Sequence, residues 1–98
     1  MSPVEKTGWV FKRAPQFKKA FDNLNPEAQR AARDAYREWK KDPLDRNSKY
    51  RPHKIIRLSA IYHKTVYGIT LGPDFKVTFL VDGNVIVSLD IGNHSIYG

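Results

Sequence analysis

Residues 75–98 read FKVTFLVDGNVIVSLDIGNHSIYG, and this stretch decides the fold. Two alternating runs flank Asp82-Gly83, and Asp-Gly in that place is the strongest short-range signal for a β-hairpin, because the turn needs positive φ angles. Alternation predicts one face of the hairpin to be apolar, from Phe75, Val77, Phe79 and Val81 on the first strand and Val85, Val87, Leu89 and Ile91 on the second. The opposite face, which carries Lys76 and Thr78, is polar enough to act on another molecule.

The length and composition limit the class of protein. A chain of 98 residues makes one domain with a modest core, and it contains no cysteine, which excludes disulfides, thiolate zinc sites and cysteine nucleophiles. No apolar run approaches the roughly 20 residues that span a bilayer, and the N-terminus has no apolar signal segment. We therefore expect a soluble, cytoplasmic protein.

Positive charge is concentrated in the first part of the chain. Residues 1–57 carry 15 Lys or Arg against seven Asp or Glu, a net charge of +8, whereas residues 58–98 have a net charge of −1. Such basicity suits an anionic partner, which could be a nucleic acid, a ribosome, an acidic protein or a membrane surface. A solvated basic surface that serves solubility is the alternative.

The N-terminal half predicts a strand followed by two helices. Residues 8–13 form a short strand candidate, and Pro15 suits the start of a helix that ends near Leu24. Asn25 is a good N-cap for a second helix, which Asp42-Pro43 would stop. The apolar stripe of this second helix has helical spacing: Ala28, Ala31, Ala32, Ala35, Tyr36 and Trp39.

The remaining segments complete an α+β fold. Residues 45–53 resemble a loop, residues 54–58 could be a short strand or an ordered lead-in, and residues 62–71 hold a clearer strand. The predicted order is β-α-α-β-β-β in a single domain over residues 1–98, with two N-terminal helices on one face of a small, mainly antiparallel sheet. The predicted core is Phe17, Phe21, Ala28, Ala32, Tyr36, Trp39, Tyr67, Ile69, Val77, Phe79, Val87 and Leu89.

This order of elements resembles the RelE/ParE superfamily, the small bacterial toxins of type II toxin–antitoxin pairs. Four segments are similar to motifs of that family, in the same order: residues 17–27, 39–43, 75–79 and 90–97. The first two match its first helix with the "Leu-Pro" junction and its second-helix exit. The third resembles a "Tyr-Arg-Val-hydrophobic-Phe" strand, and the last resembles an "Ile-Gly-x-His-…-Tyr" ending.

Several positions depart from the family pattern. Lys76 stands where many members have arginine, and Gly68 and Thr70 stand where ribosome-dependent members carry lysines. The spacing from His94 to Tyr97 is one residue shorter than in the common form. These differences bear on the transfer of residue roles more than on the fold.

The resemblance implies metal-independent cleavage of mRNA on the ribosome, in which the 2′-hydroxyl attacks its own 3′-phosphate. That reaction needs a base, an acid and positive charge, but no cofactor. His94 is the leading acid–base candidate, Lys76 could stabilise phosphate charge, and Tyr97 could stack on or orient a base. Each also has an ordinary structural interpretation: a hydrogen-bonded histidine, a surface lysine and a tyrosine that closes a sheet edge.

Further basic residues lie near predicted strand starts and could line a phosphate track: Lys54, Arg57, His63 and Lys64, with His53 beside them. The three histidines lack the spacing of metal ligands, so we expect no metal site. Neither a P-loop nor a Gly-x-Gly-x-x-Gly motif is present to indicate nucleotide chemistry.

Two functional hypotheses follow. The first is a ribosome-dependent mRNA endonuclease that arrests growth and is neutralised by an acidic antitoxin. The second is a ParE-type inhibitor that binds DNA gyrase without catalysis, which the residues at Gly68 and Thr70 favour. A basic RNA-binding module without toxicity, or a toxin that has lost its activity, is a third possibility.

Overall fold

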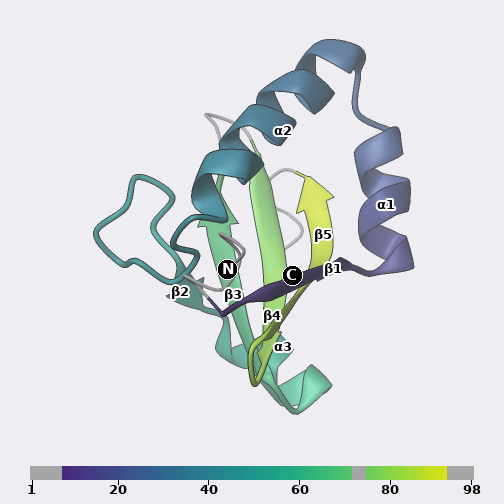
Figure 1. The fold of residues 1–98 in the computed structure, drawn as a ribbon. Helices are drawn as coiled ribbons and strands as arrows, with labels where there is room; N and C mark the ends of the chain where they lie inside the picture. The colour runs from purple at the N-terminus through teal and green to yellow at the C-terminus, as the bar shows by residue number, and fades with distance from the viewer. Residues whose placement is uncertain (1–7, 72–74, 93–98) are drawn as a thin grey trace.

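The predicted α+β fold is confirmed. A computed structural model describes residues 8–71 and 75–92, which form a five-stranded sheet with helices. The elements are β1 (Val10–Arg13), α1 (Pro15–Asp22), α2 (Pro26–Trp39), β2 (His53–Lys54), α3 (Ile56–Tyr62), β3 (Thr65–Thr70), β4 (Lys76–Asp82) and β5 (Val85–Gly92). The strand order is β1-β5-β4-β3-β2, in which β1 runs parallel to β5 and every other pair is antiparallel. α2 crosses the sheet in front of its central strands, and α1 lies to one side of it (Figure 1).

The two N-terminal helices begin where the sequence predicts. Pro15 and Pro26 each lie in the first turn of a helix. The N–H groups of that turn make no hydrogen bond within the helix, so proline costs none there. The Asn25 side chain accepts a hydrogen bond from the Ala28 N–H at 2.8 Å, which satisfies one of the free donors of α2. No helix of the described residues is long and apolar enough to cross a membrane.

The segment between the second helix and the hairpin differs from the prediction. Residues 54–58, predicted as a strand or lead-in, are divided between β2 and α3, and the strand predicted over residues 62–71 begins only at Thr65. The Ser59 side chain explains the helical turn, because its Oγ lies 2.8 Å from both the Ile55 carbonyl and the Val66 N–H. His63 then ends α3 in the left-handed conformation, with φ at 57°.

The core is centred on Trp39. Its ring lies 4.9 Å from that of Phe79, 5.0 Å from that of Tyr36 and 5.8 Å from that of Phe11, measured between centroids. Its indole N–H donates to the Pro43 carbonyl at 3.0 Å, which ties the helix exit to the core. Most of the predicted core is confirmed as buried or packed against the core, namely Phe17, Phe21, Ala32, Tyr36, Trp39, Tyr67, Ile69, Val77 and Phe79.

The prediction that Val87 belongs to this core is wrong. The pairing of β4 with β5 shifts between Thr78 and Phe79, so that Leu89 is an extra residue on β5. A β-bulge of this kind shifts the alternation by one residue, so that the side chains before it point to the opposite faces from those that strict alternation predicts. Consequently Ile86 is fully buried in the core, and Val87 is half-buried on the opposite face. Leu89 is buried but lies outside the core cluster, and Ala28 is only half-buried.

The face opposite the core is less open than the sequence predicts. Val66 and Gly68 on β3 and Thr78 on β4 are buried, although alternation places them on the polar face. Thr70 and Lys76, which pair at one end of β3 and β4, are half-buried and accessible. The end of this face near Lys76 can therefore meet another molecule.

Candidate functional site

Lys76 lies where a ligand can reach it. It precedes the core residue Val77 on β4, and alternation directs its side chain away from the helices. Its ammonium group donates to the Thr70 hydroxyl at 2.9 Å, on the paired residue of β3. This hydrogen bond holds a half-buried positive charge at the end of the sheet.

The segment before β2 brings two more nitrogen-bearing side chains to the same end. The Thr70 N–H donates to the Tyr50 carbonyl at 3.0 Å, which fixes the chain just before Arg51. Arg51 is exposed and has a left-handed backbone, with φ at 47°, an uncommon conformation for a residue other than glycine. His53 pairs with Gly68 across the sheet and so lies on the face that carries Lys76.

The ring of His53 contacts the backbone of its own segment. Its Nδ1 lies 3.3 Å from the Arg51 carbonyl oxygen, and since a carbonyl can only accept, Nδ1 is the donor. His53 therefore shares a face of the sheet with Lys76, two strands away from it, and Arg51 precedes His53 by two residues. Sequence reasoning missed Arg51 altogether and placed His53 only beside a strand start, because a two-residue strand has no detectable periodicity.

The four residues predicted to bind RNA lie elsewhere on the sheet and on α3. Lys54 pairs with Tyr67 and therefore lies on the face of the sheet opposite to that of Lys76. Arg57 is exposed on α3, and His63 is exposed just after it. The Lys64 ammonium lies 3.2 Å from a carboxylate oxygen of Asp82. Lys64 precedes Thr70 by six residues, about 20 Å along an extended strand. The structure does not bring Lys64 together with Lys76, and RNA binding by these residues stays a prediction.

His94 and Tyr97, the predicted acid–base and base-stacking residues, lie outside the described residues. Gly92, the last described residue, pairs with Lys76 across β4 and β5, and His94 follows it by two positions in the sequence. No group of three His, Asp or Glu residues that could hold a metal ion occurs within residues 8–71 and 75–92.

Comparisons with known proteins agree with the fold. No protein-family model matches the sequence, and no match is found among curated proteins. Among solved structures, the archaeal RelE–RelB complex of Pyrococcus horikoshii contains a chain 20% identical to this one, with a TM-score of 0.65 over 88% of this chain and 94% of that chain.

Two bacterial structures are similar to the same extent. The Escherichia coli DinJ–YafQ toxin–antitoxin complex gives a TM-score of 0.67 at 11% identity, over 91% of this chain and 96% of that chain. HP0894 of Helicobacter pylori gives 0.63 at 22% identity, over 89% and 96%. The chain therefore has the RelE-type α+β fold, as its resemblance to the RelE/ParE superfamily implies.

Proposed function

We propose that this protein is the toxin of a type II toxin–antitoxin pair and acts as a ribosome-dependent, metal-independent mRNA endonuclease. The carrying observation is Lys76, which Thr70 holds at one end of the sheet and which pairs with Gly92, with His53 on the same face of the sheet. The RelE-type fold and the net charge of +7 support the same function. These features together supply positive charge and an imidazole where a phosphate diester could be bound.

The reaction requires only proton transfer and charge stabilisation. A base removes the proton of the 2′-hydroxyl, whose oxygen attacks the adjacent phosphorus and forms a cyclic phosphate, while the bond to the 5′-oxygen breaks. An acid delivers a proton to that leaving oxygen, so the products are a 2′,3′-cyclic phosphate and a 5′-hydroxyl. A fixed cation stabilises the charge that develops on the phosphorus oxygens.

The residues are assigned to these steps as follows. His94 would take or give a proton, and Tyr97 would stack on or orient a base of the mRNA. Lys76 would stabilise the phosphate as a point charge, oriented by its hydrogen bond to Thr70. His53 on the same face would provide a second imidazole, so that base and acid could be separate groups.

The test compares variants after controlled induction in bacteria, with mRNA cleavage mapped by primer extension in translating extracts. We expect His94→Ala to reduce cleavage by about 10²–10⁴-fold, the usual contribution of an acid–base group, and Lys76→Ala to impair it as well. Asn47→Ala is a control for the histidine variant, because Asn47 is an exposed polar residue to which no role in RNA binding is assigned. Lys41→Ala is the matched control for lysine.

Full cleavage by both His94→Ala and Lys76→Ala would refute the catalytic assignment. The alternative is a ParE-type gyrase inhibitor, favoured by the absence of lysine at Gly68 and Thr70. Pulse labelling separates the two functions, because a ribosomal nuclease stops protein synthesis first and a gyrase inhibitor stops DNA synthesis first. An acidic protein encoded beside this chain would be the expected antitoxin partner.

A further inference from the structure

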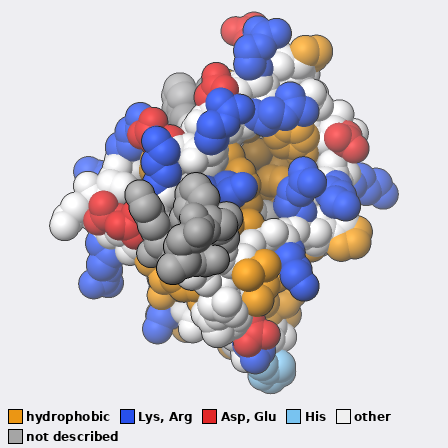
Figure 2. Space-filling view, in the orientation of Figure 1, with side chains coloured by type: hydrophobic (Ala, Val, Ile, Leu, Met, Phe, Trp, Pro, Cys, Tyr) orange, Lys and Arg blue, Asp and Glu red, His pale blue; other side chains and the backbone are white. Residues whose placement is uncertain are grey.

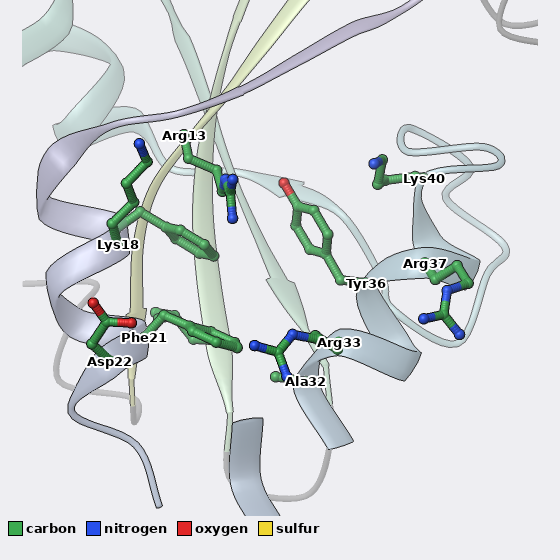
Figure 3. Close-up of a pocket in the computed structure, with 11 residues that line it drawn as sticks. Arg13, Lys18, Phe21, Asp22, Ala32, Arg33, Tyr36, Arg37 and Lys40 are labelled. Carbon is green, nitrogen blue, oxygen red and sulfur yellow. The ribbon is translucent and has the colours of Figure 1, made fainter. Parts of the chain in front are cut away.

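Two cavities in the described part of the chain differ in charge. The first is a groove of about 550 Å³ between α1 and α2, which we call the basic groove. Apolar side chains, Ile91 among them, form its floor, and Figure 2 shows a hydrophobic hollow surrounded by Lys and Arg side chains. Figure 3 shows how residues of α1 and α2 face each other across it. Against the one carboxylate of Asp22, it is lined by five cations: Arg13, Lys18, Arg33, Arg37 and Lys40.

The second cavity, of about 490 Å³, has the opposite balance of charge. To its lining α2 contributes Asp34 and Glu38, and the chain before β2 contributes Lys49 and Tyr50. Two carboxylates against one ammonium group disfavour a phosphate but suit a ligand that donates hydrogen bonds. We call this cavity the acidic pocket. On a chain with a net charge of +7, it is a place where something other than a phosphate can be bound.

Glu38 and Lys49 present a hydrogen-bond acceptor beside a donor. The Lys49 ammonium lies 3.4 Å from Oε1 of Glu38 and 5.5 Å from the centroid of the Tyr50 ring, so it is held at the pocket. The two side chains are still 56% and 70% exposed. Because a carboxylate has about four acceptor positions and an ammonium group has three donors, both groups can bind a ligand without separating.

The other carboxylate is drawn away from the pocket. Asp34 pairs with Arg37 at 3.6 Å, and Arg37 lines the basic groove. The partner of Glu38, in contrast, lines the acidic pocket itself. Glu38 is therefore the carboxylate that we assign to ligand recognition.

The acidic pocket adjoins the proposed phosphate-binding residue. Thr70 lines the pocket, and its hydroxyl accepts the hydrogen bond of the Lys76 ammonium at 2.9 Å. Ala35 and Leu71 add apolar surface to the lining, against which the flat face of a nucleobase can pack. A phosphate bound by Lys76 and a base bound in the pocket would thus belong to the same nucleotide or to adjacent ones.

We propose that the acidic pocket binds a guanine base of the RNA whose phosphate is bound at Lys76. Unpaired bases are recognised on their Watson–Crick edge, which in guanine carries two donors, N1–H and N2–H, beside the acceptor O6. The Glu38 carboxylate would accept from both donors, and the Lys49 ammonium would donate to O6. Adenine, cytosine and uracil each offer this carboxylate a single donor group on that edge.

This inference deepens the proposed function, since it assigns a base preference to the same site. That the ligand is RNA rests on the proposed function. That the ligand donates hydrogen bonds rests on the acidic pocket itself.

The experiment measures base preference by binding, without cleavage. The probes are pentanucleotides of 2′-O-methyluridine whose central nucleotide, also 2′-O-methylated, is guanosine, inosine, adenosine, cytidine or uridine, so that no 2′-hydroxyl can attack a phosphate. Each is titrated to millimolar concentration into the full chain labelled with nitrogen-15, and the amide shifts give the affinity and the location. We expect the guanosine probe to bind at least about tenfold more tightly than the uridine probe, with the largest shifts near Glu38, Lys49 and Leu71.

Glu38→Gln tests the double acceptor. It places an amide NH₂ group against the guanine donors, so the preference for guanosine over uridine should fall to within about twofold. Inosine, which lacks the N2 amine, should bind the native chain about fivefold more weakly than guanosine, and this difference should disappear in Glu38→Gln. Glu27→Gln is the matched control, because it removes the same charge from an exposed residue of α2 that lines neither cavity.

Lys49→Met tests the donor to O6. It should weaken binding of the guanosine probe by about tenfold, whereas Lys41→Met, at an exposed lysine outside both cavities, should leave binding within about twofold. Loss of the exposed ion pair between Glu38 and Lys49 should cost little stability. Circular dichroism checks that every variant is folded.

The outcomes separate the acidic pocket from the nuclease function. Equal affinity for all probes, absence of binding, equal loss in Glu27→Gln and Glu38→Gln, or shifts confined to the basic groove would overturn the pocket. A guanosine preference in binding without any ribosomal mRNA cleavage would retain the pocket and refute the nuclease. Mapped cleavage sites decide the converse case. Guanine enrichment beside the cuts that Glu38→Gln removes supports both, whereas cleavage with no such enrichment retains the nuclease and overturns the pocket.

Discussion

Replacing Ile86 and Val87 one at a time tests the register of the sheet, on which the position of Lys76 depends. Strict alternation along β5 predicts that Val87 faces the core, whereas the structure buries Ile86 there and leaves Val87 half-buried on the other face. The two residues are adjacent and both are β-branched. Their substitution by alanine therefore changes strand propensity almost equally, and the difference between the variants reports burial.

The expected magnitudes follow from the groups that are removed. Ile86→Ala deletes three fully buried carbon groups, worth about 2.5 kcal/mol at about 0.8 kcal/mol each, and the cavity raises the loss to about 3–4 kcal/mol. Val87→Ala deletes two half-buried methyl groups, for a loss of about 0.8 kcal/mol. Urea unfolding followed by circular dichroism measures both free energies, provided that the slope m is unchanged. A larger loss for Val87→Ala than for Ile86→Ala would show that the bulge, and with it the assigned faces, is wrong.

Two further predictions concern α2. Asn25→Ala should lower the free energy of unfolding by about 1 kcal/mol, since it removes the cap on the Ala28 N–H, whereas Asn25→Asp should retain most of it in the same urea assay. Burial raises the pKa of the Tyr36 hydroxyl, against the smaller lowering effects of its hydrogen bond to Ser88 and of a nearby arginine. The unfolded chain then loses this proton first, so stability should fall as pH rises above about 10, and Tyr36→Phe should make that fall shallower. An unchanged slope would show that another group, such as Tyr50, causes the alkaline loss.

The sequence was most informative where one local rule governs the backbone. Asn25-Pro26 defines the start of α2, because the cap and the proline act within one turn. The hairpin lies where it was predicted, but its turn is Gly83-Asn84 and not Asp82-Gly83, because Asp82 ends β4 and pairs with Val85; Gly83 takes the positive φ of 61°. The start of α2 and the hairpin turn depend on residues that are neighbours in the chain. They can therefore be predicted without knowledge of tertiary contacts.

The elements that sequence reasoning missed depend on distant partners. α3 has no N-cap side chain and is held by Ser59 bonding to Ile55 and to Val66 on the next strand, which no periodicity reveals. The candidate site shows the same limit. Arg51 reaches the end of the sheet because the Tyr50 carbonyl bonds to β3, a contact that belongs to the folded chain alone.

The bulge at Leu89 allows Ile86 and Ile91 to face the same core. Ile86 and Ile91 are five residues apart, and in a regular strand residues at an odd separation point to opposite faces. Both are buried in the same core cluster, so one extra residue must lie between them. Ile91 thereby reaches the floor of the basic groove, and Gly92 is aligned with Lys76. A single irregularity thus couples the packing of the core to the position of Ile91 on one face of the sheet and the alignment of Gly92 with Lys76.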